Sequence, residues 1–229
     1  MDQLQVREKE IFETLKRISK FAFVVIGGYA VNVYALPRFS VDCDIVVKDK
    51  EEADAISDEL KKIGYAIQES KSDIPYHGNF IRYEKEIAKN FRVSIDILSK
   101  EILDRQTGTR FSAEWVFDNS SIKILKGKTV SDQLKLNIIE IDALIVMKMV
   151  SCRETDIRDV FMMSPNSKNI SWIKEEVSKR TDFNERLAKL KDKISSKKFK
   201  DNLQGVFGYV DKAAFEKNLG IIKKLAKSP

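Results

Sequence analysis

Hydrophobic positions in the first half of the chain follow helical spacing in some segments and strand spacing in others. Residues 5–20 and 51–63 place apolar side chains three and four apart among charged ones, as amphipathic helices do. Residues 23–26 form a short apolar run, and residues 41–47 and 91–98 alternate as strands do. A strand over 79–84 is predicted to pair with 91–98 through a turn at 88–90. Residues 65–67 are predicted to lie at or near a sheet edge.

The second half of the chain is dominated by helical patterns. A strongly apolar run over 138–150 predicts a buried helix, and residues 170–180, 182–196 and 211–226 repeat helical spacing. Residues 165–169 interrupt this pattern, and the glycines at 205 and 208 predict a connection. Before the apolar run, residues 115–117 and 122–125 have the composition of strands. The pattern therefore predicts that strands give way to helices towards the end of the sequence.

Composition places the chain in the globular class. Of its 229 residues 43% are hydrophobic and 33% are charged, and no apolar run is long enough to span a bilayer. The first residues lack a secretion signal, and only two cysteines, Cys43 and Cys152, are present. We therefore expect a cytoplasmic protein without membrane contact. The single histidine, His77, excludes a metal site built on several imidazoles.

The positive charge is concentrated late in the sequence. Residues 151–229 contain 18 Lys or Arg and 11 Asp or Glu, a net charge of +7, whereas the whole chain carries +6. A basic helical segment of this kind suits an acceptor such as RNA. Solvated lysines on ordinary helices explain the same numbers, so both interpretations stay open.

Two carboxylates stand two residues apart in the strand over 41–47. Asp42 and Asp44 must point to the same face of that strand, where they repel each other unless a cation neutralises them. Carboxylate oxygens suit magnesium, whose shell is commonly completed by substrate phosphates. Asp96 is a lone acid in the apolar strand over 91–98 and offers the third carboxylate that two-metal transfer needs. Gly27 and Gly28, where the first strand ends, would let the backbone approach phosphates closely.

A lysine within the apolar run is the second candidate for chemistry. Lys148 needs a partner or a ligand there, because burying an unpaired ammonium is costly. On a helix that continues beyond the run, Lys148, Asp156 and Asp159 would share one face. One interpretation is an ion pair between Lys148 and Asp156 or Asp159. The other is that Lys148 contacts nucleotide phosphates while Asp156 and Arg158 orient it.

These motifs together resemble a known superfamily. The order of glycine pair, short helix, acid-x-acid strand and later strand acid resembles the DNA polymerase β-like nucleotidyltransferases. The motif Arg38-x-Ser40-x-Asp42-x-Asp44 after residues 27–31 resembles the AbiEii-type branch more narrowly, the toxin-side enzymes of type IV toxin–antitoxin pairs. Residues 142–150 followed by 153–160 resemble that family's helical Lys, then Arg and Asp motif. One departure is Tyr29, where many superfamily members have a serine able to touch phosphate.

The resemblance implies a fold, a division into domains and an activity. The fold would be α+β, a nucleotidyltransferase-like mixed sheet flanked by helices and followed by a helical C-terminal domain. Residues 1–135 would form the catalytic domain, and residues 136–229 would contact nucleotide and acceptor. The activity would be transfer of a nucleoside monophosphate from a nucleoside triphosphate to an acceptor hydroxyl, dependent on two Mg²⁺ ions. The acceptor would be RNA, such as the 3′ end of a tRNA, and a separate antitoxin protein would restrain the enzyme.

The resemblance also implies roles for individual residues. The residues assigned to catalysis and to metal binding are Asp42, Asp44 and Asp96. The residues assigned to nucleotide binding are Gly27, Gly28, Arg38, Ser40, Lys148, Asp156 and Arg158. Two other functions remain open: a non-catalytic module of the same fold that binds a nucleotide or a partner, and transfer to a small molecule or a protein.

Overall fold

The computed structural model describes residues 2–68, 80–208 and 210–225, so His77 lies outside the described part of the chain. The chain divides into two compact units, each described here by itself. The first unit comprises Met1–Val33, Phe39–Leu103 and Arg110–Ile139. The second unit comprises Tyr34–Arg38, Asp104–Thr109 and Glu140–Pro229.

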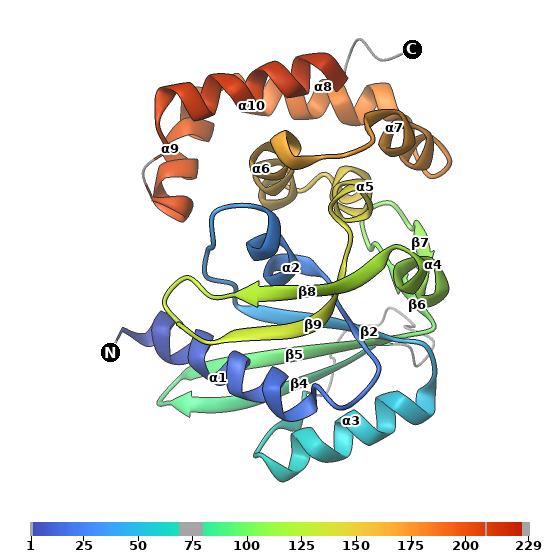
Figure 1. Cartoon of the computed structure of the whole chain (residues 1–229), viewed down its shortest axis with the longest axis vertical. Helices are drawn as coiled ribbons and strands as arrows, with labels where there is room; N and C mark the ends of the chain where they lie inside the picture. Colours follow the sequence, from blue (N-terminus) through green and yellow to red (C-terminus); the bar gives the residue numbers. More distant parts are fainter. Residues whose placement is uncertain (1, 69–79, 209, 226–229) are drawn as a thin grey trace. The chain divides into compact units, whose positions relative to one another are not determined.

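The first unit is built on a mixed sheet, seven-stranded within the described residues, in the spatial order β3-β4-β5-β2-β1-β9-β8 (Figure 1). Its strands are β1 (Val24–Val25), β2 (Asp42–Val47), β3 (Ala66–Ile67), β4 (Phe80–Ala88), β5 (Phe91–Ser99), β8 (Ser120–Lys126) and β9 (Gln133–Ile139). Strand β2 runs parallel to β5 and antiparallel to β1, and β1 runs parallel to β9. Strands β4 and β5 form the predicted antiparallel hairpin, and β3 is at the predicted edge.

Helices cover the sheet of the first unit. They are α1 (Gln3–Ile18), α2 (Gly27–Tyr34), α3 (Lys50–Lys62) and α4 (Ala113–Asp118), and the small hairpin of β6 (Glu101–Leu103) and β7 (Arg110–Ser112) accompanies them. Helices α1 and α3 pack against each other and against β5. The apolar side of α1 is buried, with Ile11, Leu15 and Ile18 fully covered, as its spacing predicted.

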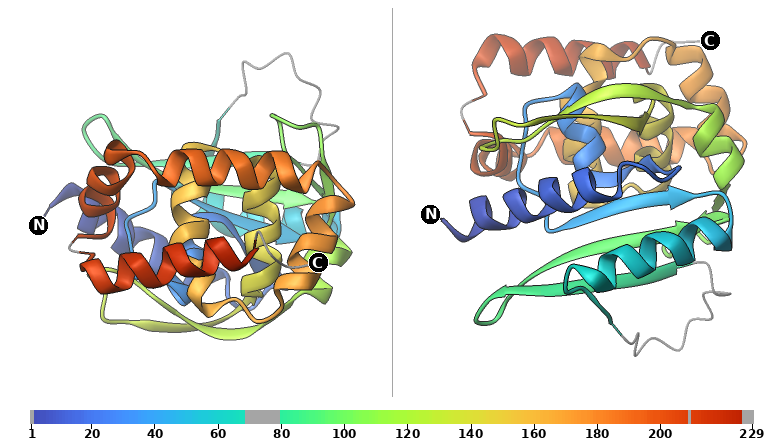
Figure 2. Two further views of the ribbon diagram at one scale, coloured as in Figure 1. Left: turned by 90° about the horizontal axis from the view of Figure 1, so that it is seen from above. Right: turned by 60° about the horizontal axis from the view of Figure 1, so that its bottom comes forward.

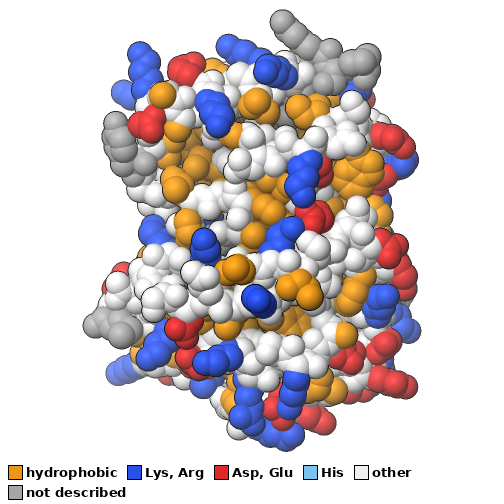
Figure 3. Space-filling model, in the orientation of Figure 1, with side chains coloured by type: hydrophobic (Ala, Val, Ile, Leu, Met, Phe, Trp, Pro, Cys, Tyr) orange, Lys and Arg blue, Asp and Glu red, His pale blue; other side chains and the backbone are white. Residues whose placement is uncertain are grey.

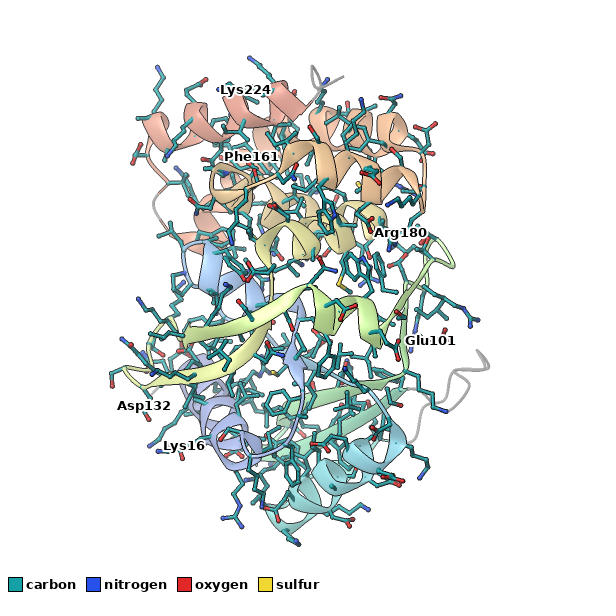
Figure 4. All side chains as sticks on the ribbon, turned by 45° about the vertical axis from the view of Figure 1, so that its right-hand side comes forward. Lys16, Glu101, Asp132, Phe161, Arg180 and Lys224 are labelled. Carbon is teal, nitrogen blue, oxygen red and sulfur yellow. The ribbon has the colours of Figure 1, made fainter. Side chains whose placement is uncertain are left out.

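The second unit is helical. Its elements are α5 (Ile141–Ser151), α6 (Glu154–Met163), the short 3₁₀ helix η1 (Ser164–Asn166), α7 (Ile170–Ser178), α8 (Phe183–Ile194), α9 (Lys197–Phe207) and α10 (Lys212–Leu225). Helix α6 packs against α5, α8 and α10, and Figure 2 shows α8 and α10 crossing it. Phe161 of α6 is fully buried (Figure 4). The centroid of its ring lies 5.3 Å from that of Phe199 on α9 and 5.0 Å from that of Phe215 on α10.

Four local predictions were wrong. Residues 138 and 139 belong to β9 and not to a helix, because an apolar run fits a buried strand as well as a buried helix. The helix predicted to continue past Lys148 ends at Cys152, which adopts a left-handed backbone with φ of 50°. Residues 115–117 form part of α4, whose start is capped by Ser112, and Gly205 lies inside α9.

The predicted class of fold is confirmed: the chain is α+β, with a mixed sheet flanked by helices and a helical C-terminal region. Among the residues that the structure describes, no helix combines the length and apolarity that a membrane span requires.

Candidate functional site

The two acids of strand β2 face the same side of the sheet. The residues that alternate with them, Cys43 and Ile45, are fully buried on the other side. Strand β5 runs beside β2 in parallel, and the register pairs Asp44 with Asp96. Directly paired residues of neighbouring strands point to the same face. Asp42, Asp44 and Asp96 therefore share one face of two adjacent strands, and we call these three residues the acid face.

An arginine that the sequence patterns had not singled out contacts the acid face. Arg82 lies on β4, and the register pairs it with Asp96. Its Nε donates to Asp96 Oδ1 over 2.8 Å and its Nη2 to Asp96 Oδ2 over 2.6 Å, which makes a bidentate pair. The same Nη2 donates to Asp42 Oδ2 over 3.3 Å. Arg82 thus bridges the acids of two different strands.

The charge of the acid face is only partly balanced by this arginine. Burial raises the pKa of Asp96, and the hydrogen bonds and charge of Arg82 offset that rise only in part, while the charge of Asp42 adds to it. The same contacts with Asp96 raise the pKa of Arg82. A second, weaker partner of Asp42 is the Ser94 hydroxyl, 3.5 Å from Oδ1. The face is therefore an acidic site that favours cations.

The glycine pair lies against the acid face. Helix α2 begins at Gly27, whose φ of 62° is in the left-handed region. A Cβ atom at this position would lie 1.9 Å from Asp44 Oδ2, far inside van der Waals contact. Only glycine therefore allows the Asp44 carboxylate to rest against the backbone here. Gly28 follows in the first turn of α2 and is buried.

Four of the predicted nucleotide-binding residues belong to the second unit, where one further acid, Asp159, pairs with two of them. Arg38 makes a bidentate pair with Asp159, over 3.0 and 2.8 Å. Lys148 lies 2.8 Å from Asp159 and 3.0 Å from Asp156. These four residues, Arg38, Lys148, Asp156 and Asp159, form what we call the ion cluster. The ion pair that the sequence allowed for Lys148 is thus present, even though the helix that was predicted to carry it is broken at Cys152.

Arg158 stands beside the ion cluster with an unsatisfied donor. Its Nε is buried and has no hydrogen-bond partner in the described part of the chain. Burial lowers the pKa of Arg158, which the charge of Asp159 offsets only in part. An unpaired buried N–H of this kind is costly, so an acceptor such as a phosphate oxygen would stabilise it. Ser40, the remaining predicted residue, is half-buried in the segment that precedes β2.

The comparisons with known proteins decide the family. The model of the nucleotidyl transferase AbiEii toxin family of type IV toxin–antitoxin systems matches residues 15–217. The chain belongs to the AbiEii family. The activity class of this family is nucleotidyl transfer. The family match therefore confirms the resemblance found in the sequence motifs, for the family and for its class of activity.

Solved structures share the fold of this AbiEii-family chain at low identity. JHP933 from Helicobacter pylori is 17% identical with a TM-score of 0.51, and the match covers 99% of this chain and 95% of that one. MenT4, a nucleotidyltransferase toxin from Mycobacterium tuberculosis H37Rv, is 13% identical with a TM-score of 0.62, covering 99% and 85%. At such identities the likeness concerns the fold alone. No curated protein matches the chain.

The donor chemistry of the acid face, though not the spacing of its three carboxylates, suits a hard divalent cation. It offers carboxylate oxygens, which Mg²⁺ prefers, and one of them rests in the space that Gly27 leaves open. Across the residues that the structure describes, no three His, Cys, Asp or Glu side chains are grouped closely enough to hold a metal ion. One cationic partner at the face is the guanidinium of Arg82, hydrogen-bonded to Asp42 and Asp96.

Proposed function

We propose that this AbiEii-family protein transfers a nucleoside monophosphate from a nucleoside triphosphate to an acceptor hydroxyl with release of pyrophosphate, and that the reaction depends on Mg²⁺. The observation that carries the proposal is the acid face, in which Asp44 and Asp96 are register partners on parallel strands. Acids at these positions are costly for a merely structural sheet, because like charges on one face destabilise it. A role in holding cations accounts for them.

The residues that would hold the metal are Asp42, Asp44 and Asp96. Bound Mg²⁺ would neutralise the triphosphate and lower the pKa of the acceptor hydroxyl. Gly27 would leave room for the Asp44 carboxylate at the start of α2, since any side chain at position 27 would displace that carboxylate. We assign this chemistry to the catalytic domain predicted over residues 1–135.

We assign nucleotide contacts to the helical residues 136–229 together with Arg38, Ser40, Gly27 and Gly28. Within the ion cluster Lys148 and Arg38 are already paired with carboxylates. Arg158 is therefore the cation best able to donate a hydrogen bond to a phosphate oxygen, because its buried Nε has no partner in the described residues. Lys148 and Asp156 would then hold the start of α6 in the position that Arg158 needs.

RNA is the acceptor that we propose, with the 3′ end of a tRNA as the first to test. The net charge of +7 over residues 151–229 supports a polyanionic partner. On the face shown in Figure 3, Lys and Arg side chains lie among Asp, Glu and hydrophobic side chains. We further propose that the enzyme works in the cytoplasm, where its substrates are, and that an antitoxin protein restrains it.

The test is transfer of label from each of the four nucleoside triphosphates to RNA and to protein fractions. With the acceptor found, Asp42→Asn and Asp96→Asn are expected to reduce incorporation by about a hundredfold or more, because the charge that holds the cations is lost. Removal of Mg²⁺ with EDTA should abolish incorporation. The matched control is Asp54→Asn, an exposed acid on α3 that pairs with Lys50, and it should leave the rate unchanged. Undiminished incorporation in either acid-face variant would reject the assignment.

A further inference from the structure

Arg82 is a cation placed where the proposed function requires metal ions. Its guanidinium makes hydrogen bonds to two of the three acids of the acid face, from a strand that neither acid belongs to. The three carboxylates and Arg82 together carry a net charge of −2. One divalent cation would neutralise that charge, whereas two would leave an excess of positive charge that weakens the attraction of the guanidinium for the acids.

The contacts of Arg82 with the two acids differ in strength. Asp96 receives two short hydrogen bonds, and its side chain is only 5% exposed. Asp42 receives one bond of 3.3 Å, and its side chain is 37% exposed. A single long bond to a solvated carboxylate is far weaker than a buried bidentate pair. The bond to Asp42 is therefore the one that a competing cation can replace.

We propose that Arg82 is a positioning residue that stands in for a divalent cation: it bridges Asp42 and Asp96 while no metal is bound, and it releases Asp42, but not Asp96, when metal binds. The proposal rests on the proposed function, since it concerns the same acids. Its physical basis is that carboxylates on one face repel each other without a counter-cation, so Arg82 keeps the face intact between reaction cycles. The cost is that metal has to compete with a charge already present.

The experiment measures binding of Mn²⁺ to the full chain without nucleotide, by calorimetric titration with MnCl₂ at fixed pH and ionic strength. Arg82→Gln is expected to bind Mn²⁺ about fivefold to tenfold more tightly than the unmodified chain, because the competing charge is gone. Arg82→Lys keeps the charge but cannot form the bidentate bridge, so its affinity should rise by about two- to threefold. This second variant also serves if Arg82→Gln folds poorly.

The matched control is Arg92→Gln. Arg92 lies on β5, as Asp96 does, and its exposed guanidinium pairs with Glu84 of β4. The variant changes the net charge by the same amount, and its Mn²⁺ affinity should stay within about twofold of the unmodified chain, since the Arg92 side chain is 61% exposed and salt screens its charge. In EDTA, Arg82→Gln should melt at a lower temperature than Arg92→Gln, and saturating MnCl₂ should narrow that difference.

Three results would overturn the inference. They are unchanged or weaker Mn²⁺ affinity in both Arg82 variants, an equal gain in Arg92→Gln, and absence of Mn²⁺ binding in all of the proteins. The label-transfer assay decides the proposed function separately. Tighter Mn²⁺ binding by the Arg82 variants without label transfer by the unmodified chain would refute the proposed function and support the inference. Label transfer by the unmodified chain without tighter Mn²⁺ binding by the Arg82 variants would support the proposed function and refute the inference.

Discussion

Gly27→Ala is expected to abolish nucleotidyl transfer, with incorporation of label falling by about a hundredfold or more. The alanine Cβ would lie 1.9 Å from Asp44 Oδ2 and 2.9 Å from its Cγ, so the carboxylate would have to leave its place beside α2. The backbone adds to the effect, because a φ of 62° is strained by about 1–2 kcal/mol for any residue with a side chain. Label incorporation measures the first effect, and urea unfolding measures the second.

Gly108→Ala separates the two effects. Gly108 also has a left-handed backbone, with φ of 71°, but a Cβ there would meet nothing within 4 Å. We expect this variant to lose about 1 kcal/mol of stability from backbone strain and to keep its transfer rate. Equal loss of transfer in both variants would show that strain alone, and not the displacement of Asp44, explains the effect of Gly27→Ala.

The strands that carry the three acids could be predicted because apolar and polar side chains alternate along them. Asp42 and Asp44 follow from the period of two, and the turn before residue 91 follows from Asn90, which adopts a φ of 59°. The sequence did not reveal that β5 runs parallel to β2, since a helix and two strands separate them in the chain. That register, with Asp44 opposite Asp96, is what brings the acids together.

Arg82 was missed for a related reason. The sequence predicts the hairpin over residues 79–98 but leaves its register open, and a shift of one residue would turn Arg82 to the other face. Counting from the turn at Asn90 is complicated by a bulge between Glu86 and Ala88. The failure at Cys152 is different in kind: a non-glycine residue in a left-handed conformation ends α5, and composition gives no signal for it.

Asp159→Asn is expected to destabilise the protein by about 3–5 kcal/mol, the usual effect of removing one partner of a buried ion pair. Asp159 is fully buried and accepts from Arg38 and Lys148, both of which are about nine-tenths buried, so the variant removes the carboxylate that these two buried cations share. For a chain of this length the melting temperature should fall by about 10 °C. Asp54→Asn, which removes the exposed pair with Lys50, should change stability by less than about 0.5 kcal/mol.

The stability difference between the unmodified chain and Asp159→Asn should depend on pH if the lost charge causes it. Burial alone would raise the pKa of Asp159, but the charges of Lys148 and Arg38 outweigh it and lower the pKa. A lowered pKa contributes stability above the pKa of the unfolded state, about 3.9 for Asp, and that contribution is lost as the pH falls further. The gap in unfolding free energy between the unmodified chain and Asp159→Asn should therefore be constant from about pH 5 to 8 and shrink below about pH 4. A gap of the same size at all these pH values would mean that lost packing, and not lost charge, causes the destabilisation.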